Sequence, residues 1–441
     1  MTALRFAFSF ILFSTMAVTN SAFADANECQ RIKEELGQLF YVNVDGNGQS
    51  AEAIDPAYIR MVHELNIGGV LPKPLFQKSG FDSIAESNRK LQAATKLPLF
   101  IGLDKVLALQ ASGPAVHVGL GYGAGKLSDI NRFSAQCAGR WGLIEAFLHR
   151  ALGLNQALGP TIERNPKGGL LAGPADEVEP YSRAYIESFN ELGVLTTLKH
   201  FPYTPDDWNP HTSTADTQNS VADVYDRLEI FRRNAGQSDF VMSTHLYNSN
   251  IDPDSVATFS KKWVEILRQQ VGFKGLLMTD GLIMIDNNGA AIGVLKDWPS
   301  QYPVNDNHTI FAIRAILAGH DMVILEGTSV DTRNVFREVT NIACQDGELP
   351  RRLRERIAES YERIRAFKLA NATALRPQIT IPRELISKAL DFEYASSCAG
   401  NDSLKKDPKF TGACRAICSD DKAYEALKQE LLAFGFAGLK R

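Results

Sequence analysis

Side chains that could act on a substrate are concentrated in the segment Leu198–Thr214, which reads LKHFPYTPDDWNPHTST. An apolar run ends there in Lys199 and His200, and the following loop carries two acids, a Trp and His211. Imidazole, amine and carboxylate groups are the usual general acids and bases of enzymes. A buried run that ends in charged groups costs folding free energy unless those groups are paired or hydrated. The segment therefore predicts a functional pocket.

Four further polar residues end or directly follow apolar runs in the same way. These residues are Asp104, His245, Asp280 and Glu326. One such ending carries little information, because any strand can end in a charged residue. Five endings of this kind in one chain predict that the polar side chains meet at a single site.

Each of these residues also has a structural interpretation that the sequence leaves open. His200 is suited to a hydrogen bond inside a barrel, and Lys199 to an ion pair with an acid. Asp280 is suited to capping the helix that follows its strand, a common role of Asp. His245 has an alternative as a core histidine, and Glu326 has one as a solvated loop residue.

The combination of residue types is suited to the cleavage of sugars. A glycosidic bond breaks through an oxocarbenium-like state, which one carboxylate can trap covalently while a second group protonates the leaving oxygen. Charged side chains such as Asp104 and Lys199 bind sugar hydroxyls, and the rings of Tyr203 and Trp208 offer faces that can cover a sugar ring. The residues therefore favour a carbohydrate-active site.

The elements that carry these residues follow a regular pattern, in which short β-rich runs alternate with amphipathic helical periods. Strands are predicted at 39–44, 68–71, 98–104, 154–160, 194–201, 239–245, 274–280 and 321–325. Helices are predicted at 56–65, 83–96, 132–152, 178–192, 221–234, 261–271, 309–318, 332–343 and 350–369. Eight β/α units in one stretch predict an α/β fold, a closed (β/α)8 TIM-type barrel whose active site lies at the carboxyl ends of the strands.

A doubly wound open sheet is the alternative architecture. Such a sheet normally has a glycine-rich phosphate-binding turn after an early strand. The glycine cluster GLGYGAG at 119–125 does not follow a predicted strand, so the barrel is favoured.

Composition and charge exclude some classes of partner. The chain has 441 residues and a formal net charge of -4, and its basic residues are scattered, so nucleic acid is not expected as a partner. The N-terminus has Arg5, a short apolar run and an Ala-x-Ala ending at Ala24, which predicts a cleaved signal peptide at 1–24 and an exported protein, periplasmic or secreted. No later segment approaches the about 20 apolar residues of a membrane span, so no membrane insertion is expected after cleavage.

The remaining chain divides into a barrel domain at 25–372 and a cysteine-containing extension at 373–441. The six cysteines are Cys29, Cys137, Cys344, Cys398, Cys414 and Cys418. An even number of cysteines in an exported protein predicts disulfides, although the pairing stays open. Cys414 and Cys418 lack a second half-site, so a metal is not expected. The extension, with a helix near 420–434, is expected to clasp the barrel.

Two segments resemble bacterial β-N-acetylglucosaminidases of glycoside hydrolase family 3. KHFP at Lys199–Pro202, followed by Asp206 and by Asn209-Pro210-His211, is similar to that family's KHFPGHGD and the Asp-x-His that follows it. GFKGLLMTDGLIM at 272–284 is similar to the family's second motif, which ends Ser-Asp-Asp-Leu-x-Met. Weaker similarity at 36–46 and 317–325 keeps the family's order, and the resemblance covers about residues 36–370.

The resemblance implies a retaining, exo-acting glycosidase that removes β-linked N-acetylglucosamine without metal or cofactor. Asp280 matches the catalytic nucleophile, and His211 matches the general acid/base on a mobile loop. The residues that match sugar contacts are Lys199, His200 and Asp104, and His245 is expected to join them at the rim. Supporting roles are expected for Asp206, Trp208 and Asn209. The implied partner is a glycan, of the cell-wall or chitin type.

The sequence also departs from the family at several positions. The family pairs its acid/base His with an Asp, where this chain has Asn209, and its sugar-binding Arg falls on Leu170. Lys105–Leu109 replaces Gln-Glu-Gly-Gly-Arg, Gly281 replaces the Asp after the nucleophile, and Tyr203 replaces a loop glycine.

These departures keep a second hypothesis open, a barrel that has lost most turnover and acts as a glycan-binding or scaffold protein. A metal-dependent hydrolase is a third hypothesis. It is disfavoured because His200 and His211 show no ligand spacing with a third residue.

Overall fold

The computed structural model describes residues 26–44, 54–72, 81–103, 107–108, 116–117, 135–162, 175–204, 219–288, 295, 297–376, 381–389 and 421–434. The predicted signal peptide and several loops therefore lie outside the described residues. So do the residues Asp104, Asp206, Trp208, Asn209 and His211.

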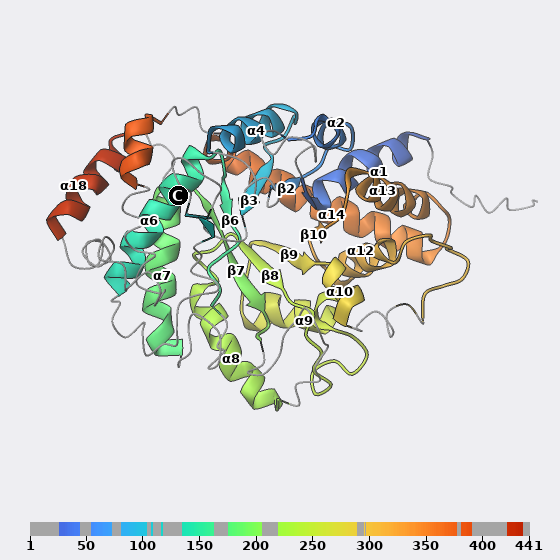
Figure 1. The fold of residues 1–441 in the computed structure, drawn as a ribbon. Coiled ribbons are helices and arrows are strands. Elements are labelled where there is room, and N and C mark those ends of the chain that lie inside the picture. The colour runs from blue at the N-terminus through green and yellow to red at the C-terminus, as the bar shows by residue number, and fades with distance from the viewer. Residues whose placement is uncertain are drawn as a thin grey trace, which may run out of the picture.

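Eight parallel strands of the described residues form a closed barrel (Figure 1). They are β1 (Phe40–Asn43), β2 (Gly69–Leu71), β3 (Phe100–Leu103), β6 (Gln156–Ala157), β7 (Leu195–Phe201), β8 (Phe240–Ser243), β9 (Leu276–Gly281) and β10 (Met322–Leu325). Pairing of Tyr41 with Ile324 of β10 and with Gly69 of β2 closes the barrel. The predicted fold class and all eight predicted strands are confirmed.

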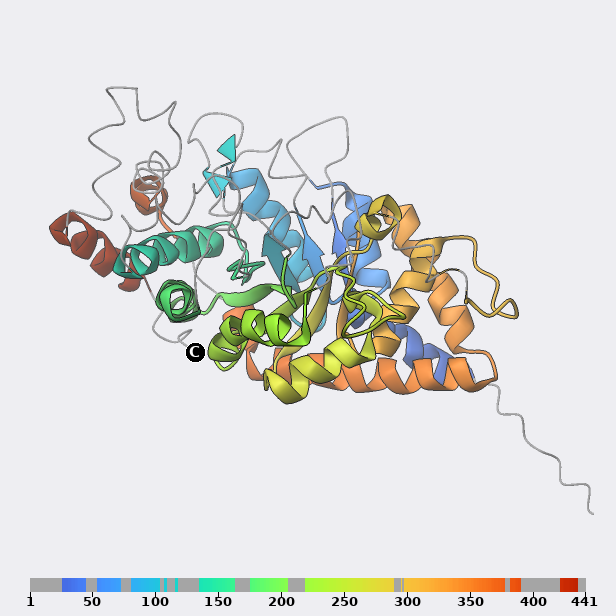
Figure 2. The ribbon, with the colours of Figure 1, turned by 90° about the horizontal axis from the view of Figure 1, so that it is seen from below.

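Helices surround the barrel. They are α1 (Ala26–Leu39), α2 (Pro56–Glu64), α4 (Phe81–Ala93), α6 (Ala135–Ala151), α7 (Ala175–Glu191), α8 (Val221–Asn234), α9 (Lys261–Glu265), α10 (Ile283–Asn288), α12 (Asn307–Ala318), α13 (Ser329–Ala343), α14 (Glu348–Ala370), α15 (Ala372–Leu375) and α18 (Asp421–Leu432). Figure 2 shows α1, in blue, and α14, in orange, side by side along one side of the barrel. None of the described helices is both long and apolar enough to span a membrane.

The structure differs from the sequence prediction in several elements, and the short helices α10 and α15 are among those not predicted. The helix predicted at 261–271 is α9 followed by a π-helical segment, η2 (Ile266–Gln270). The helix α1 and the short antiparallel pair β4 (Leu107–Ala108) and β5 (Val116–His117) were not predicted from the sequence. A 3-10 turn, η1 (Ala257–Phe259), lies between β8 and α9.

A buried polar layer crosses the inside of the barrel. The Tyr41 hydroxyl donates to Gln156 Oε1 at 3.2 Å, and Gln156 Nε2 donates to Thr197 Oγ1 at 3.0 Å. A Cβ at Gly69 would lie 2.3 Å from the Tyr41 ring, and one at Gly102 would lie 2.1 Å from its hydroxyl oxygen. The glycines of β2 and β3 are therefore required by the large side chain of β1.

The C-terminal helix α18 packs against α6. Tyr424, Leu427 and Leu431 are buried there, and the Arg140 guanidinium lies 4.7 Å from the centroid of the Tyr424 ring. Arg140 also forms an ion pair with Asp421. Part of the extension after residue 372 thus contributes to the apolar core of the barrel's outer layer.

One disulfide, Cys29–Cys344, joins α1 to the C-terminal end of α13. The side chain of Cys137 and the residues Cys398, Cys414 and Cys418 lie outside the described part of the chain.

Loss of this disulfide is expected to destabilise the protein. The bond connects residues 315 positions apart, so it restricts the unfolded chain strongly. Replacement of Cys29 and Cys344 by Ser should lower the free energy of unfolding by about 2–5 kcal/mol, measured by urea denaturation. The wild type in reductant should match the variant, and equal stability of variant and oxidised wild type would contradict the expectation.

Because two histidines are buried, we expect the free energy of unfolding to decrease at acidic pH. Burial lowers the pKa of His149 from 6.5 to about 4 and that of His320 to about 3. Below pH 6.5 these histidines bind protons in the unfolded chain but stay neutral in the folded protein. Their contribution to the free energy of unfolding is therefore fully present above pH 6.5 and falls as the pH drops toward their folded-state pKa values. Each ring should lower the free energy of unfolding by about 2 kcal/mol between pH 7 and pH 5.

Urea denaturation at the two pH values measures this loss. In His149→Gln the difference between pH 7 and pH 5 should shrink by about 2 kcal/mol, the share of that ring. A variant that loses as much stability as the wild type would show that His149 is protonated in the folded state.

Candidate functional site

Asp280 lies at the carboxyl end of β9, where the barrel opens. The preceding residues of the strand are buried, and the Asp280 side chain is 20% exposed. Its Oδ1 atom accepts a hydrogen bond of 2.8 Å from the backbone N–H of Gly281. Gly281 is the last residue of β9, and α10 begins only at Ile283, so this hydrogen bond does not cap the helix. The carboxylate is thus placed at the rim, as the sequence predicts for a nucleophile.

His200 is brought to the same place by β7. Its Nε2 lies 3.7 Å from Asp280 Oδ2, and its side chain is 22% exposed. The strand β8 separates β7 from β9, so both side chains lean across the end of β8. A protonated His200 would form an ion pair with Asp280 at this distance.

Lys199 precedes His200 and is 7% exposed. Its carbonyl accepts from Ile162 N at 2.9 Å, and its backbone bridges to Thr161, which fixes this end of β7 to the segment after β6. The peptide bonds Lys199–His200 and Phe201–Pro202 are cis. Lys199 and His200 are thus held at the end of β7, and His200 lies next to the carboxylate of Asp280.

His245 lies behind this rim and is fully buried. Its Nδ1 lies 2.7 Å from Thr258 Oγ1, and its Nε2 lies 2.9 Å from the carbonyl oxygen of Gly281. A carbonyl only accepts, so Nε2 carries the hydrogen. His245 is therefore enclosed behind the rim, bonded to the backbone beside Asp280, and has no side-chain surface exposed toward the barrel mouth.

Tyr203 does not offer a face to a sugar, which corrects the expectation from the sequence. The side chain is fully buried, and its hydroxyl accepts from Asn248 Nδ2 at 2.8 Å. The Arg227 guanidinium lies 5.3 Å from the ring centroid. Tyr203 therefore anchors the start of the loop after β7 to the loop after β8.

Glu326 follows β10 and is more than a solvated loop residue. A Cβ at Gly281 would lie 2.3 Å from Glu326 Oε2, so the carboxylate is packed against the backbone next to Asp280. The signal in the sequence was Gly281 itself, a glycine where the resembling motif has a side chain. A missing side chain leaves a volume that a neighbour can fill.

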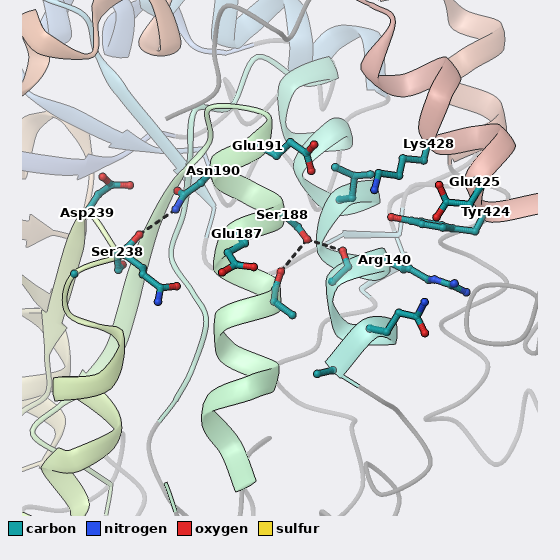
Figure 3. A pocket seen from close by; sticks show the side chains of 17 residues that line it. Arg140, Glu187, Ser188, Asn190, Glu191, Ser238, Asp239, Tyr424, Glu425 and Lys428 are labelled. Carbon is teal, nitrogen blue, oxygen red and sulfur yellow. Dashed lines mark hydrogen bonds between the residues drawn. The ribbon is translucent and has the colours of Figure 1, made fainter. Parts of the chain in front are cut away.

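A separate cleft of about 890 Å³ lies between α6, α7 and α18 (Figure 3). Its walls carry charged groups of both signs, with Glu187 and Glu191 on α7 and Lys428 on α18. Ser238 and Asp239 also line it and precede β8, at the amino ends of the strands. The cleft is therefore distinct from the rim that holds Asp280.

Within the described ranges, no group of three His, Cys, Asp or Glu side chains is arranged to hold a metal ion. The described part of the rim instead carries Lys199, His200, Asp280 and Glu326 on β7, β9 and β10 and just beyond them. Carboxylate and imidazole groups at the carboxyl ends of barrel strands are typical of a hydrolytic active site.

Comparison with known proteins identifies the family. The model of the glycosyl hydrolase family 3 N terminal domain matches residues 31–365. The chain therefore belongs to glycosyl hydrolase family 3 and is a glycosidase. The resemblance drawn from the KHFP and GFKGLLMTDG segments is confirmed.

Curated relatives are 25–30% identical to this chain over the segments that match. A β-hexosaminidase of Xanthomonas axonopodis pv. citri is 26% identical over 265 residues, which is 56% of this chain and 75% of that protein. One of Shewanella frigidimarina is 30% identical over 175 residues, or 37% of this chain and 45% of that protein.

Solved structures share the fold. A glycoside hydrolase family 3 β-N-acetylglucosaminidase from Paenibacillus sp. str. FPU-7 has a TM-score of 0.65 at 21% identity, and the match covers 83% of this chain and 68% of that one. A β-N-acetylhexosaminidase from Beutenbergia cavernae has a TM-score of 0.59 at 20% identity, covering 76% and 98%.

Proposed function

We propose that the protein is an exported, retaining, exo-acting glycosidase that removes β-linked N-acetylglucosamine from the non-reducing end of glycans. The observation that carries this proposal is the partly exposed carboxylate of Asp280 at the end of β9, 3.7 Å from His200. A carboxylate at the mouth of the barrel is placed to attack an anomeric carbon. The substrate class is supported by the names of the relatives, which are β-hexosaminidases and β-N-acetylglucosaminidases.

The reaction proceeds by two displacements. An oxygen of Asp280 attacks the anomeric carbon and the bond to the leaving oxygen breaks, while protonated His211 gives its hydrogen to that oxygen. Neutral His211 then takes a proton from water, whose oxygen attacks the same carbon and releases the carboxylate. Two inversions retain the configuration of the sugar.

The other site residues hold the terminal sugar. Lys199, His200 and Asp104 bind its hydroxyl groups, and His245 keeps the backbone after the nucleophile in place. Asp206, Trp208 and Asn209 support the loop that carries His211. No metal or cofactor takes part.

Export is proposed from the N-terminal segment 1–24. The disulfide Cys29–Cys344 supports this location, because disulfides persist in oxidising compartments such as the periplasm and the extracellular space.

Replacement of the nucleophile tests the activity. Mature wild type is offered an aryl β-N-acetylglucosaminide and an aryl β-glucoside beside Asp280→Ala, in which hydrolysis should fall by at least about a thousandfold. A 5-fluoro-N-acetylglucosaminyl fluoride should form a covalent adduct that mass spectrometry places on the peptide containing Asp280.

Three outcomes are distinguishable. Hydrolysis that is lost in the variant supports the glycosidase. Binding of muropeptides or chitin fragments without turnover would favour the impaired, glycan-binding alternative. An adduct on another residue would overturn the assignment of Asp280.

Asn209→Asp should raise kcat. A carboxylate beside His211 stabilises the imidazolium that forms during proton transfer, whereas an amide does so much less. The gain is expected to be about tenfold, measured on the aryl N-acetylglucosaminide. Asn209→Ala provides the comparison, and an unchanged or lower kcat in Asn209→Asp would contradict the assigned partnership with His211.

A further inference from the structure

The carboxylate of Glu326 occupies the space above Gly281. A Cβ built at Gly281 would meet Oε2 at 2.3 Å and Cδ at 2.9 Å, distances that real Cβ contacts do not show. Position 281 therefore accommodates Glu326 only because it is glycine. The acidic group belongs to the chain segment after β10 but lies on β9, one residue after Asp280.

This placement requires the Glu326 side chain to turn back over the rim. Gly281 pairs with Ile324 across β9 and β10, and Glu326 lies two residues beyond Ile324. A strand rises about 3.3 Å per residue, so the backbone of Glu326 lies beyond the level of Gly281 along the strand direction. A side chain that pointed further along that direction would not reach Gly281. The carboxylate instead returns to the level of Gly281 and is only partly exposed.

The segment after Glu326 holds it in this position. Gly327 has a φ of 131°, a backbone conformation that favours glycine. Thr328 and Asp331 then form a capping box that begins α13. The backbone on the carboxyl side of Glu326 is thus fixed by a turn and a capped helix.

Glu326 and Asp280 are near enough to act on one sugar. With a Cα–Cβ bond of about 1.5 Å and successive Cα atoms about 3.8 Å apart, Oε2 of Glu326 lies within about 8 Å of the Asp280 Cα. The two carboxylates therefore lie at neighbouring backbone positions of one rim, within the span of a single sugar ring and its hydroxyl groups.

We infer that Glu326 is a substrate-binding residue that accepts a hydrogen bond from a hydroxyl of the terminal sugar. This inference rests on the proposed function. A carboxylate accepts from a hydroxyl about twice as strongly as a neutral group, and it selects a sugar that presents a hydroxyl at that position. Gly281 and Glu326 thus act as a pair, in which the first provides the space and the second the charge.

Two substitutions probe the pair in different ways. Glu326→Gln removes the charge and keeps the shape. Gly281→Ala keeps the charge and displaces the carboxylate, because the far end of a flexible side chain can move away from the new methyl group. Gly236→Ala is the matched control, since nothing lies within 4 Å of a Cβ at that glycine.

The measurement is hydrolysis of aryl β-N-acetylglucosaminides that lack one hydroxyl each. One analogue lacks the hydroxyl that Glu326 binds in the parent substrate. For the wild type, kcat/KM should be about 10- to 100-fold lower on that analogue than on the parent. In Glu326→Gln and Gly281→Ala, kcat/KM on the parent substrate should fall by a similar factor. On that analogue, kcat/KM of the two variants should differ little from that of the wild type. If Glu326 had a purely structural role, its substitution would lower kcat/KM by the same factor for all substrates.

Binding of N-acetylglucosamine, measured by calorimetry, separates this inference from the proposed function. Binding that weakens in both variants supports Glu326 even if wild type shows no turnover. Turnover that both variants retain overturns the role of Glu326 and leaves the glycosidase intact. Wild type that neither binds nor hydrolyses overturns both.

Discussion

The hydrogen-bonded closure of the barrel between β1 and β10 is the constraint on which the candidate site depends. Once all eight parallel strands are paired on both sides, their carboxyl ends share one rim. The polar ends of β7, β9 and β10 then fall within one arc of adjacent strands. Lys199, His200, Asp280 and Glu326 are distant in sequence, and only this closure gives them a common location.

Charged groups at the two ends of the barrel have different surroundings. Before β10, buried Asp321 lies 3.0 Å from the nitrogens of both Arg268 and Arg363 and also accepts from Leu277 N. Buried Lys368 donates to Gln38 and to the carbonyl of Gly68, and burial lowers its pKa. These groups are enclosed and compensated, as buried charges must be to persist in a fold. At the rim, Asp280 and His200 keep about a fifth of their side-chain surface exposed, which leaves them accessible to a ligand.

The strands and most helices could be predicted because their signals are local. Apolar runs buried on both faces mark the strands, and helical periods separate them. The position of Asp280 at the end of β9 follows from the same local pattern. The surroundings of His245 and Tyr203 could not be predicted, because both depend on the loop after β8, which supplies Thr258 to one and Asn248 to the other. Exposure of a side chain near a rim is a tertiary property that sequence position does not determine.

Departures from a family motif are therefore better judged by occupied volume than by residue identity. At position 281 the lost side chain is matched by the carboxylate of Glu326, which follows β10, so a carboxylate remains beside Asp280. At position 203 a glycine is replaced by a ring that packs under Arg227 and Asn248, so the start of the loop gains fixed contacts. The first change preserves the electrostatics of the rim and the second lowers the freedom of the backbone. The pairing of Gly281 with Glu326 thus shows that a position can lose its own side chain while the rim keeps a carboxylate beside Asp280.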